Sequence, residues 1–343
     1  MFRWFLRRLG FRDVVTGTVF LTSQAVGDLE TVAFPHLSVW SGSDRWVSDD
    51  HGRYDAGSRN RVSARLEGRY ARVWDRNRQR LGEDQLKYTG RPSFNWNRAL
   101  GIHTGRSDFA CLMAYYHVTR AHEDFCRLVG RSSLSSIDSD GWLEELQVVI
   151  NEAPELEQNA CWDFGNVRIV YGAGAACAND SLVTYHEYSH AVIDLFTDTL
   201  FPTVSPGDAA SDKEREAAAV CEALADYLAC SLKEHPKVLQ GEPDERVLAT
   251  PHVLQGTGHL HADSLALSSA LWKLGDQRKP GRTVVDQWVV EILRRLRTSP
   301  QLIRTFGFAE ARQMLIDIDR DDPNSRGGYG SLIAEVFHKH GIR

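Results

Sequence analysis

The chain has 343 residues, of which 42% are apolar and 25% are charged, and its formal net charge is −6. This composition is typical of a globular protein with more than one folding unit, and it excludes fibrous and disordered classes. The acidic balance argues against a nucleic-acid partner, and no stretch approaches the roughly 18 uncharged apolar residues that a transmembrane helix needs.

The first residues, 1–12, form a short basic arm. The uncharged run 14–26 that follows has only a weak similarity to a signal peptide, because Asp13 separates it from the basic residues and polar side chains dilute it. The sequence is therefore compatible with both an exported and a cytoplasmic protein.

Residues 13–82 predict a small all-β unit. Short runs rich in β-branched and aromatic residues alternate with Gly, Ser and Asp clusters, which is typical of strands and turns. The predicted strands are 14–21, 36–40, 61–66 and 70–74, and the polar stretch 75–84 is the best candidate for a linker. Segments 17–20, 33–40 and 48–54 resemble the transthyretin-like regulatory β-sandwiches of some carboxypeptidases. The resemblance implies a domain that packs, regulates or binds.

From Ser107 onward the periodicity changes. Apolar and aromatic positions from Leu112 to Thr119 recur at i, i+3, i+4 and i+7, which predicts an amphipathic helix. Runs 146–150 and 167–171 predict two strands, and the pattern is almost wholly helical after Lys213. The expected fold class is therefore α+β.

The segment Tyr185-His186-Glu187-Tyr188-Ser189-His190 contains the pattern H-E-x-x-H within apolar surroundings. Helical spacing places His186 and His190 on one face, so their imidazoles can converge on one zinc ion, with Glu187 beside the metal. A helix with two half-buried histidines and a solvated glutamate is the alternative for this motif alone.

A catalytic zinc needs a third protein ligand and an open position for water. Glu222 is the candidate for this ligand, in a strongly helical segment in which Asp226 lies one turn later on the same face. A carboxylate in the position of Asp226 suits an acceptor that orients a metal-bound imidazole. Both acids stand among alanines, leucines and aromatics, where unpaired carboxylates are costly.

The six cysteines contain no C-x-x-C pair, so thiolate metal sites are not expected. We predict that Cys161, Cys177, Cys221 and Cys230 are not zinc ligands. The sequence leaves open whether disulfides form.

Together, the two metal motifs resemble the gluzincins, in particular the thermolysin and fungalysin families of secreted zinc endopeptidases. Other segments resemble motifs of these families and follow one another in the same order along the chain. They are 114–120, 159–162 with 169–174, 246–251, 258–264, 308–312 and 335–341. The resemblance spans residues 107–343. It implies a bilobed thermolysin-like catalytic domain at 90–343, with a mixed lobe at 90–200 that includes the zinc helix and a helical lobe at 201–343.

The resemblance also implies roles for individual residues. Asn159 and Ala160 match an edge strand that hydrogen-bonds the peptide substrate, and Arg246 matches an arginine that holds a substrate carbonyl. His261 matches the histidine that stabilises the transition state, and Ser264 favours it over His259 for this role.

Four positions depart from the family pattern. Gly256 stands where thermolysin has an aspartate that partners the catalytic histidine, and no tyrosine lies between His190 and Glu222. Leu182 replaces a calcium-binding aspartate, which puts a structural calcium in doubt. Cys221 replaces an asparagine that braces a ligand histidine.

These features predict a zinc-dependent metalloendopeptidase that acts on a peptide or protein substrate. Zinc activates a water molecule, and Glu187 takes its proton and passes it to the leaving nitrogen. Two alternatives remain, namely a zinc-holding but catalytically weak binding module and a non-peptidase zinc hydrolase of a small amide or ester. The sequence determines neither the cleavage specificity nor the oligomeric state.

Overall fold

The computed structural model describes residues 12–22, 25–79, 82–83, 85–134, 142–152, 159–172, 177–198, 201–202, 209–239, 245–323, 325 and 327–343. Residues 1–11 of the predicted basic arm lie outside this described part. None of the helices described there has the length and apolar character that crossing a membrane requires.

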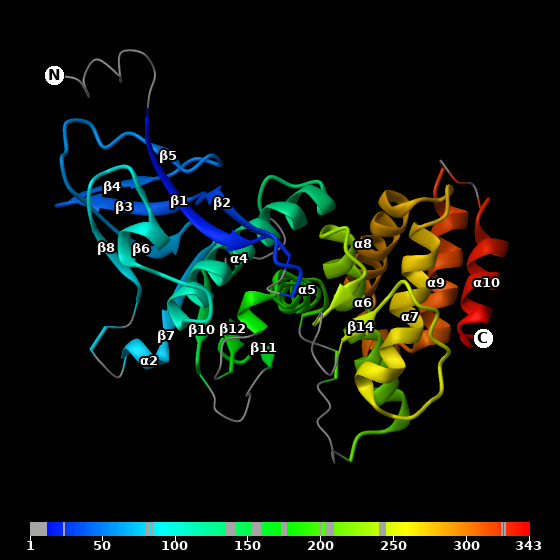
Figure 1. The fold of residues 1–343 in the computed structure, drawn as a ribbon. Helices are drawn as coiled ribbons and strands as arrows, with labels where there is room; N and C mark the ends of the chain where they lie inside the picture. Colours follow the sequence, from blue (N-terminus) through cyan, green and yellow to red (C-terminus); the bar gives the residue numbers. More distant parts are fainter. Residues whose placement is uncertain are drawn as a thin grey trace. The chain divides into compact units, whose positions relative to one another are not determined.

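The chain folds into two compact units. Unit 1 comprises Met1–Glu123 and Asp138–Thr184, and unit 2 comprises Asp124–Ile137 and Tyr185–Arg343. The boundaries fall within helices α4 (Ser107–Val129) and α5 (Ser181–Thr197). Unit 1 holds two sheets and unit 2 is mainly helical, in agreement with the predicted α+β class (Figure 1).

An eight-stranded sheet is the larger sheet of unit 1. Its strands follow the order β11-β12-β10-β7-β6-β3-β4, and β8 also pairs with β6. Strand β10 runs parallel to both β7 and β12, and the other pairs are antiparallel. The strands are β3 (Leu37–Ser41), β4 (Asp44–Val47), β6 (Val62–Gly68), β7 (Ala71–Asp75), β8 (Lys87–Gly90), β10 (Leu146–Ile150), β11 (Ala160–Asp163) and β12 (Arg168–Tyr171).

The second sheet of unit 1 is built around β1 (Asp13–Phe20). Side chains of β1 alternate between buried and half-buried positions, as expected for a strand with one face in the core. It pairs with β2 (Leu29–Ala33), β5 (Arg53–Tyr54) and β9 (Phe94–Asn95). Glycine is required at position 17, because a Cβ there would lie 2.3 Å from the ring of Phe34.

The predicted strands are confirmed within a residue or two as β1, β3, β6, β7, β10 and β12, and the helix predicted around Leu112 is confirmed as α4.

The compact units, however, do not coincide with the predicted division at 13–82 and 90–343. Strand β7 pairs in parallel with β10, with residues 71–75 opposite 146–150. One sheet therefore contains strands from both predicted domains.

The linker predicted at residues 75–84 is wrong for its first half. Asp75 ends β7 and is 1% exposed, and it accepts hydrogen bonds from Asn77 N, Ser107 Oγ and Asn151 Nδ2. The short helix α2 (Arg76–Gln79) follows directly. Its arginines form ion pairs within unit 1, Arg76 with Glu152 and Arg78 with Asp108. The polar run is therefore a network that joins β7 to α4 and β10.

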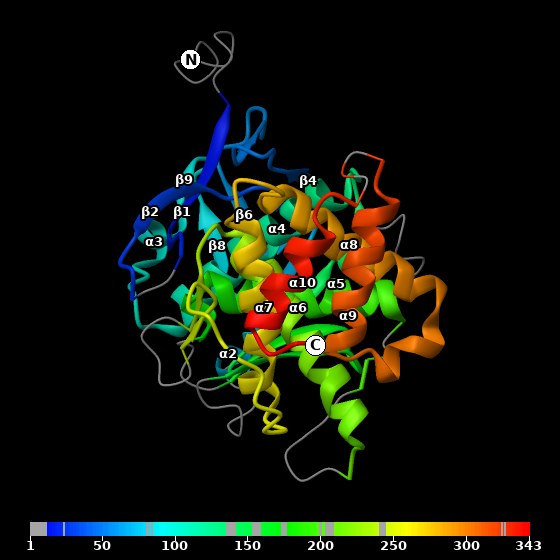
Figure 2. The same ribbon diagram turned by 90° about the vertical axis from the view of Figure 1, so that its right-hand side faces the viewer.

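Unit 2 is a bundle in which α6 (Asp212–Leu232) and α7 (Leu260–Gly275) pack closely against each other. Alanines of α6 and serines and alanines of α7 make up much of their buried surfaces, and such small side chains let helix backbones approach. The remaining helices, α8 (Arg282–Thr298), α9 (Phe308–Asp321) and α10 (Gly330–Lys339), complete the bundle (Figures 1 and 2). Two short strands, β13 (Lys237–Val238) and β14 (Arg246–Val247), form a hairpin after α6.

A half-buried carboxylate links α6 to α8. Asp286 Oδ1 accepts hydrogen bonds from Tyr227 Oη at 2.7 Å and from Ser231 Oγ at 2.6 Å. Burial raises the pKa of Asp286 above its usual value, although these hydroxyls and the charge of Arg282 oppose the shift. The folded state therefore holds the proton more tightly than the unfolded state, so stability falls as pH rises through the folded pKa.

We expect Asp286→Asn to raise the free energy of unfolding at pH 7. The amide keeps an oxygen acceptor for both hydroxyls but removes the buried charge. The gain over the wild type should disappear as pH falls below the usual aspartate range, where the wild-type carboxyl is also neutral. Urea unfolding from pH 3 to pH 8 measures this, with exposed Asp321→Asn as the control. A gain that does not depend on pH would contradict the explanation.

Candidate metal centre

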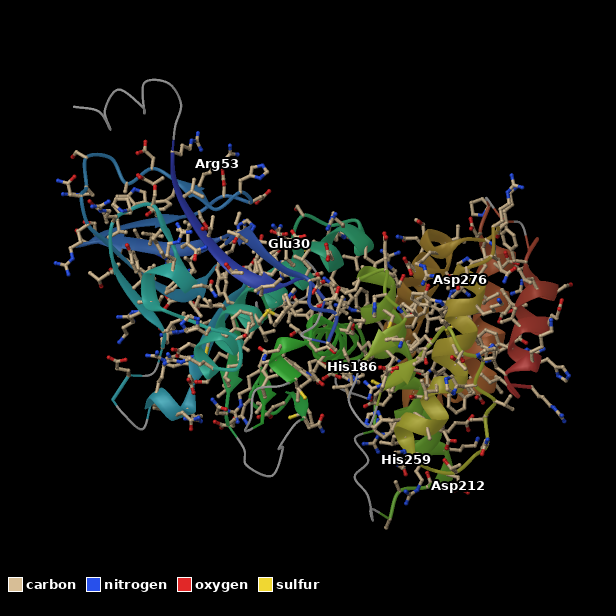
Figure 3. The ribbon with its side chains drawn as sticks, viewed as in Figure 1. Glu30, Arg53, His186, Asp212, His259 and Asp276 are labelled. Atoms are coloured by element: carbon tan, nitrogen blue, oxygen red, sulfur yellow. The ribbon has the colours of Figure 1, made fainter. Side chains whose placement is uncertain are left out.

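Helix α5 presents the two histidines of the H-E-x-x-H motif on one face. His186 Nε2 and His190 Nε2 lie 3.1 Å apart, and the two rings are nearly perpendicular, with an interplanar angle of 85°. His186 is 4% exposed, and the apolar residues that flank the motif are buried in the surrounding core. Figure 3 shows His186 on this helix. The spacing of four residues thus brings two imidazole nitrogens to one point.

Helix α6 supplies a carboxylate at the same point. Glu222 Oε2 lies 3.3 Å from His186 Nε2, and Glu222 Oε1 lies 3.5 Å from His190 Nε2. These three side chains form a group of ligand atoms that could hold a metal ion. The structure therefore brings together the three residues that the sequence predicted as ligands.

The spacing of these atoms can be compared with that of a tetrahedral metal site. Zinc binds imidazole nitrogen and carboxylate oxygen at about 2.0–2.1 Å, so neighbouring ligand atoms on a tetrahedron lie about 3.3 Å apart. The separations here are 3.1, 3.3 and 3.5 Å. The two nitrogens, and the carboxylate oxygen paired with each of them, therefore already have separations close to those that a small four-coordinate cation requires.

The charges of the group also favour a cation. Burial alone would raise the pKa of Glu222, but His190, His186 and His261 hold it well below its usual value. Burial alone would lower the pKa of His190, but Glu222 and Cys221 raise it well above the usual value. Glu222 Oε2 is buried and receives no hydrogen bond from any described residue. An anionic acceptor in this position needs positive charge beside it.

Asp226 lies behind the ligands and is fully buried. Its Oδ1 atom lies 2.9 Å from His186 Nδ1, and it accepts bonds from Arg246 Nη2 at 2.9 Å and Arg246 Nε at 3.1 Å. A proton on His186 Nδ1, facing this carboxylate, leaves Nε2 free to bind a metal. Burial would raise the pKa of Asp226, but Arg246 and His186 lower it.

Arg246 was expected to hold a substrate carbonyl, and the structure adds a partner that the sequence did not reveal. Its guanidinium is buried against Asp226, and its pKa is raised because Asp226, Glu222 and Glu187 outweigh the effect of burial. Only long-range packing joins position 246 to 226, so no local motif could have signalled this ion pair.

Glu187 is 6% exposed and follows His186 on α5. Among the described residues it has no hydrogen-bond or ion-pair partner, although Arg246 lies within electrostatic range of it. A buried carboxylate without a fixed partner is costly for folding and is typical of functional sites.

His261 borders the site from the first turn of α7. Its Nδ1 atom lies 3.3 Å from Glu222 Oε2, and its side chain is 47% exposed. Glu222 is thus the carboxylate next to this imidazole, and position 256 is a glycine. His259, at the N-cap of α7, is exposed, with its ring centre 6.4 Å from that of His261.

Cys221 contacts a ligand histidine without joining the ligand group. Its Sγ atom lies 3.6 Å from His190 Nδ1, on the opposite side of the ring from Nε2. None of the described cysteines belongs to a group that could hold a metal ion.

Asn159 and Ala160 lie in unit 1. Ala160 begins β11, which is the edge strand of the eight-stranded sheet and pairs with β12. Asn159 is exposed, and its carbonyl accepts a bond from Gly172 N at 2.9 Å. The edge position predicted for this pair is therefore observed, and the role in substrate binding stays a prediction.

Unit 1 contains a second group, His36, Asp50 and Glu123, whose side-chain nitrogen and oxygen atoms are also close enough together to hold a metal ion. His36 Nε2 lies 2.9 Å from Glu123 Oε1 and 3.2 Å from Asp50 Oδ1, and Arg120 pairs with the other oxygen of Glu123. Asp50 is largely exposed. These ion pairs compensate the charges of the group without a metal ion, so the group is interpreted as an ordinary ion-pair cluster.

No family model matches the sequence, and no curated protein is similar enough to it to count as a relative.

We expect the purified protein to bind about one divalent metal ion per chain through the three ligands. His186→Ala and His190→Ala should each reduce the metal content to less than about a tenth of an ion per chain after dialysis, because two ligands rarely hold such an ion. Elemental analysis measures the content, and far-UV circular dichroism should show that helix content is kept. His338→Ala, at an exposed histidine of α10, is the control. Full metal content in a His186→Ala, His190→Ala double variant would exclude this site.

Proposed function

We propose that the protein is a zinc metallopeptidase of the gluzincin type. The observation that carries the proposal is the spacing of His186 Nε2, His190 Nε2 and Glu222, which fits the ligand separations of a tetrahedral zinc site with one open position. Nitrogen and oxygen ligands without thiolates suit zinc, and two histidines with one glutamate are the ligand set of thermolysin-type catalytic sites.

In this proposal the residues around the metal have separate tasks. A bound zinc ion supplies Lewis acidity and lowers the pKa of a coordinated water to about 7. Glu187 accepts the proton of the attacking water and delivers it to the leaving nitrogen. His261 and Arg246 donate hydrogen bonds toward the oxygen that becomes negative, and Asp226 keeps His186 in the binding orientation.

The bilobed thermolysin-like arrangement is part of the proposal. Its support is the division into a sheet-rich unit and a helical unit that holds the ligands. The edge strand β11, with Asn159 and Ala160, would add a peptide in extended conformation by main-chain hydrogen bonds.

A binding module that holds zinc without turnover is the second candidate. The departures at Gly256 and between His190 and Glu222, where thermolysin has an aspartate and a tyrosine, favour it. Glu187 argues against it, because a buried carboxylate that has no partner among the described residues would destabilise a scaffold without contributing to its binding.

We expect Glu187→Gln to retain metal while the rate of peptide cleavage falls by roughly two to four orders of magnitude, the usual effect of losing a positioned general base. His261→Ala should lose less, about two to three orders of magnitude, because it removes one donor to the oxyanion and leaves the base in place. Metal content and cleavage of an unstructured protein substrate are measured near pH 7.

Glu335→Gln, at an exposed position of α10, controls for the change in net charge. If the wild type holds zinc but cleaves no member of a broad peptide library, the binding module replaces the peptidase. If Glu187→Gln cleaves as fast as the wild type, the assigned general base is wrong.

A further inference from the structure

A pocket of about 360 Å³ lies between the N-terminal halves of α6 and α7 and the start of α9. Ala219 lines it from α6, one turn before Glu222, and Leu260 lines it from α7, directly before His261. Ala219 and Glu222 are three residues apart on α6, which corresponds to about 4.5 Å along the helix axis. The pocket therefore begins within about the length of one side chain from the candidate metal ligands. Figure 3 shows Asp212 and His259 at this end of the helical unit.

The pocket combines apolar walls with an excess of negative charge. Ala219, Leu254, Leu260 and Phe308 provide the apolar surface. Three carboxylates line the same space, those of Asp212, Glu216 and Asp263, against one guanidinium, that of Arg215. Three negative charges and one positive charge leave a net charge of −2.

Glu216 is held in place before any ligand arrives. Its Oε1 atom accepts a hydrogen bond from Phe308 N at 2.9 Å, which leaves its second oxygen available. Its carboxyl group packs on Gly307, where a Cβ would lie 2.5 Å from the carboxyl carbon. A carboxylate fixed in this way binds a cation without a large loss of side-chain entropy.

Part of the backbone donor capacity around the pocket is already used within the fold. Glu214 N bonds to Ser211 Oγ, and Ser211 N bonds to Glu214 Oε2, so a capping box closes the start of α6. Asp263 accepts bonds from Thr257 N and Gly258 N in the loop before α7. With three carboxylates and one guanidinium in its lining, the pocket favours a cationic ligand over an anionic one.

We propose that this pocket is a specificity site for a basic side chain of the peptide substrate. The apolar walls contact the aliphatic stem of a lysine or arginine, and Glu216, with Asp212 at the exposed start of α6, pairs with its charge. A free α-amino group would share the charge but has no stem to fill the walls. The inference rests on the proposed peptidase function and deepens it.

The test uses N-acetylated fluorogenic peptides that are identical except at one position, which carries Lys, Arg, Leu or Glu and is moved along the peptide. We expect the wild type to prefer Lys and Arg at one position by about tenfold or more in kcat/KM over Leu. Glu216→Gln keeps an acceptor for Phe308 N and should reduce this ratio about tenfold. Glu335→Gln has the same change of net charge outside the pocket and should leave the ratio unaltered.

Binding of the same peptides to the Glu187→Gln protein, followed by fluorescence anisotropy, gives a measurement that needs no turnover. If the wild type cleaves nothing but this variant binds basic peptides in a Glu216-dependent way, the peptidase function fails and the pocket stands. Three outcomes would overturn the inference. They are cleavage without a preference for basic residues, a preference that Glu216→Gln leaves unchanged, and activity that requires a free α-amino group.

Discussion

The buried carboxylate of Asp226 is the group on which the candidate site depends. It is fully buried and lies within 3.1 Å of His186 Nδ1 and of two nitrogens of Arg246. A lone carboxylate in such a position would be strongly unfavourable, and the guanidinium of Arg246 offsets that cost. The pair in turn fixes the His186 ring, so the geometry of the ligands follows from an ion pair that connects α6 to β14.

The site has a stability cost that a metal would relieve. Two imidazole nitrogens and one carboxylate converge within 3.5 Å, and Glu222 Oε2 has no hydrogen-bond donor among the described residues. Without a metal, protons on the histidines must compensate the charge of Glu222, in keeping with the raised pKa of His190. A divalent cation would replace those protons, so metal binding and folding stability should be coupled.

The parts of the site that the sequence predicted are those that depend on one helix. The pair His186 and His190 and the pair Glu222 and Asp226 are each four residues apart, and helical spacing alone puts each pair on one face. The ion pair of Asp226 with Arg246 and the parallel pairing of β7 with β10 join positions 20 and about 75 residues apart. No local periodicity encodes such contacts, so the ion pair was missed and residues 75–79 were read as a linker.

His261 is coupled to the candidate metal ligands through Glu222. With glycine at position 256, the carboxylate nearest to its imidazole is Glu222, at 3.3 Å, which is also a candidate metal ligand. Asp263 instead fixes the loop at Thr257 and Gly258, which precedes the helix that carries the histidine. A metal ion would draw charge from Glu222 and weaken the electrostatic attraction between this carboxylate and His261. The 47% exposed ring could then turn toward a substrate oxygen, so metal binding would prepare the histidine for the role proposed for it.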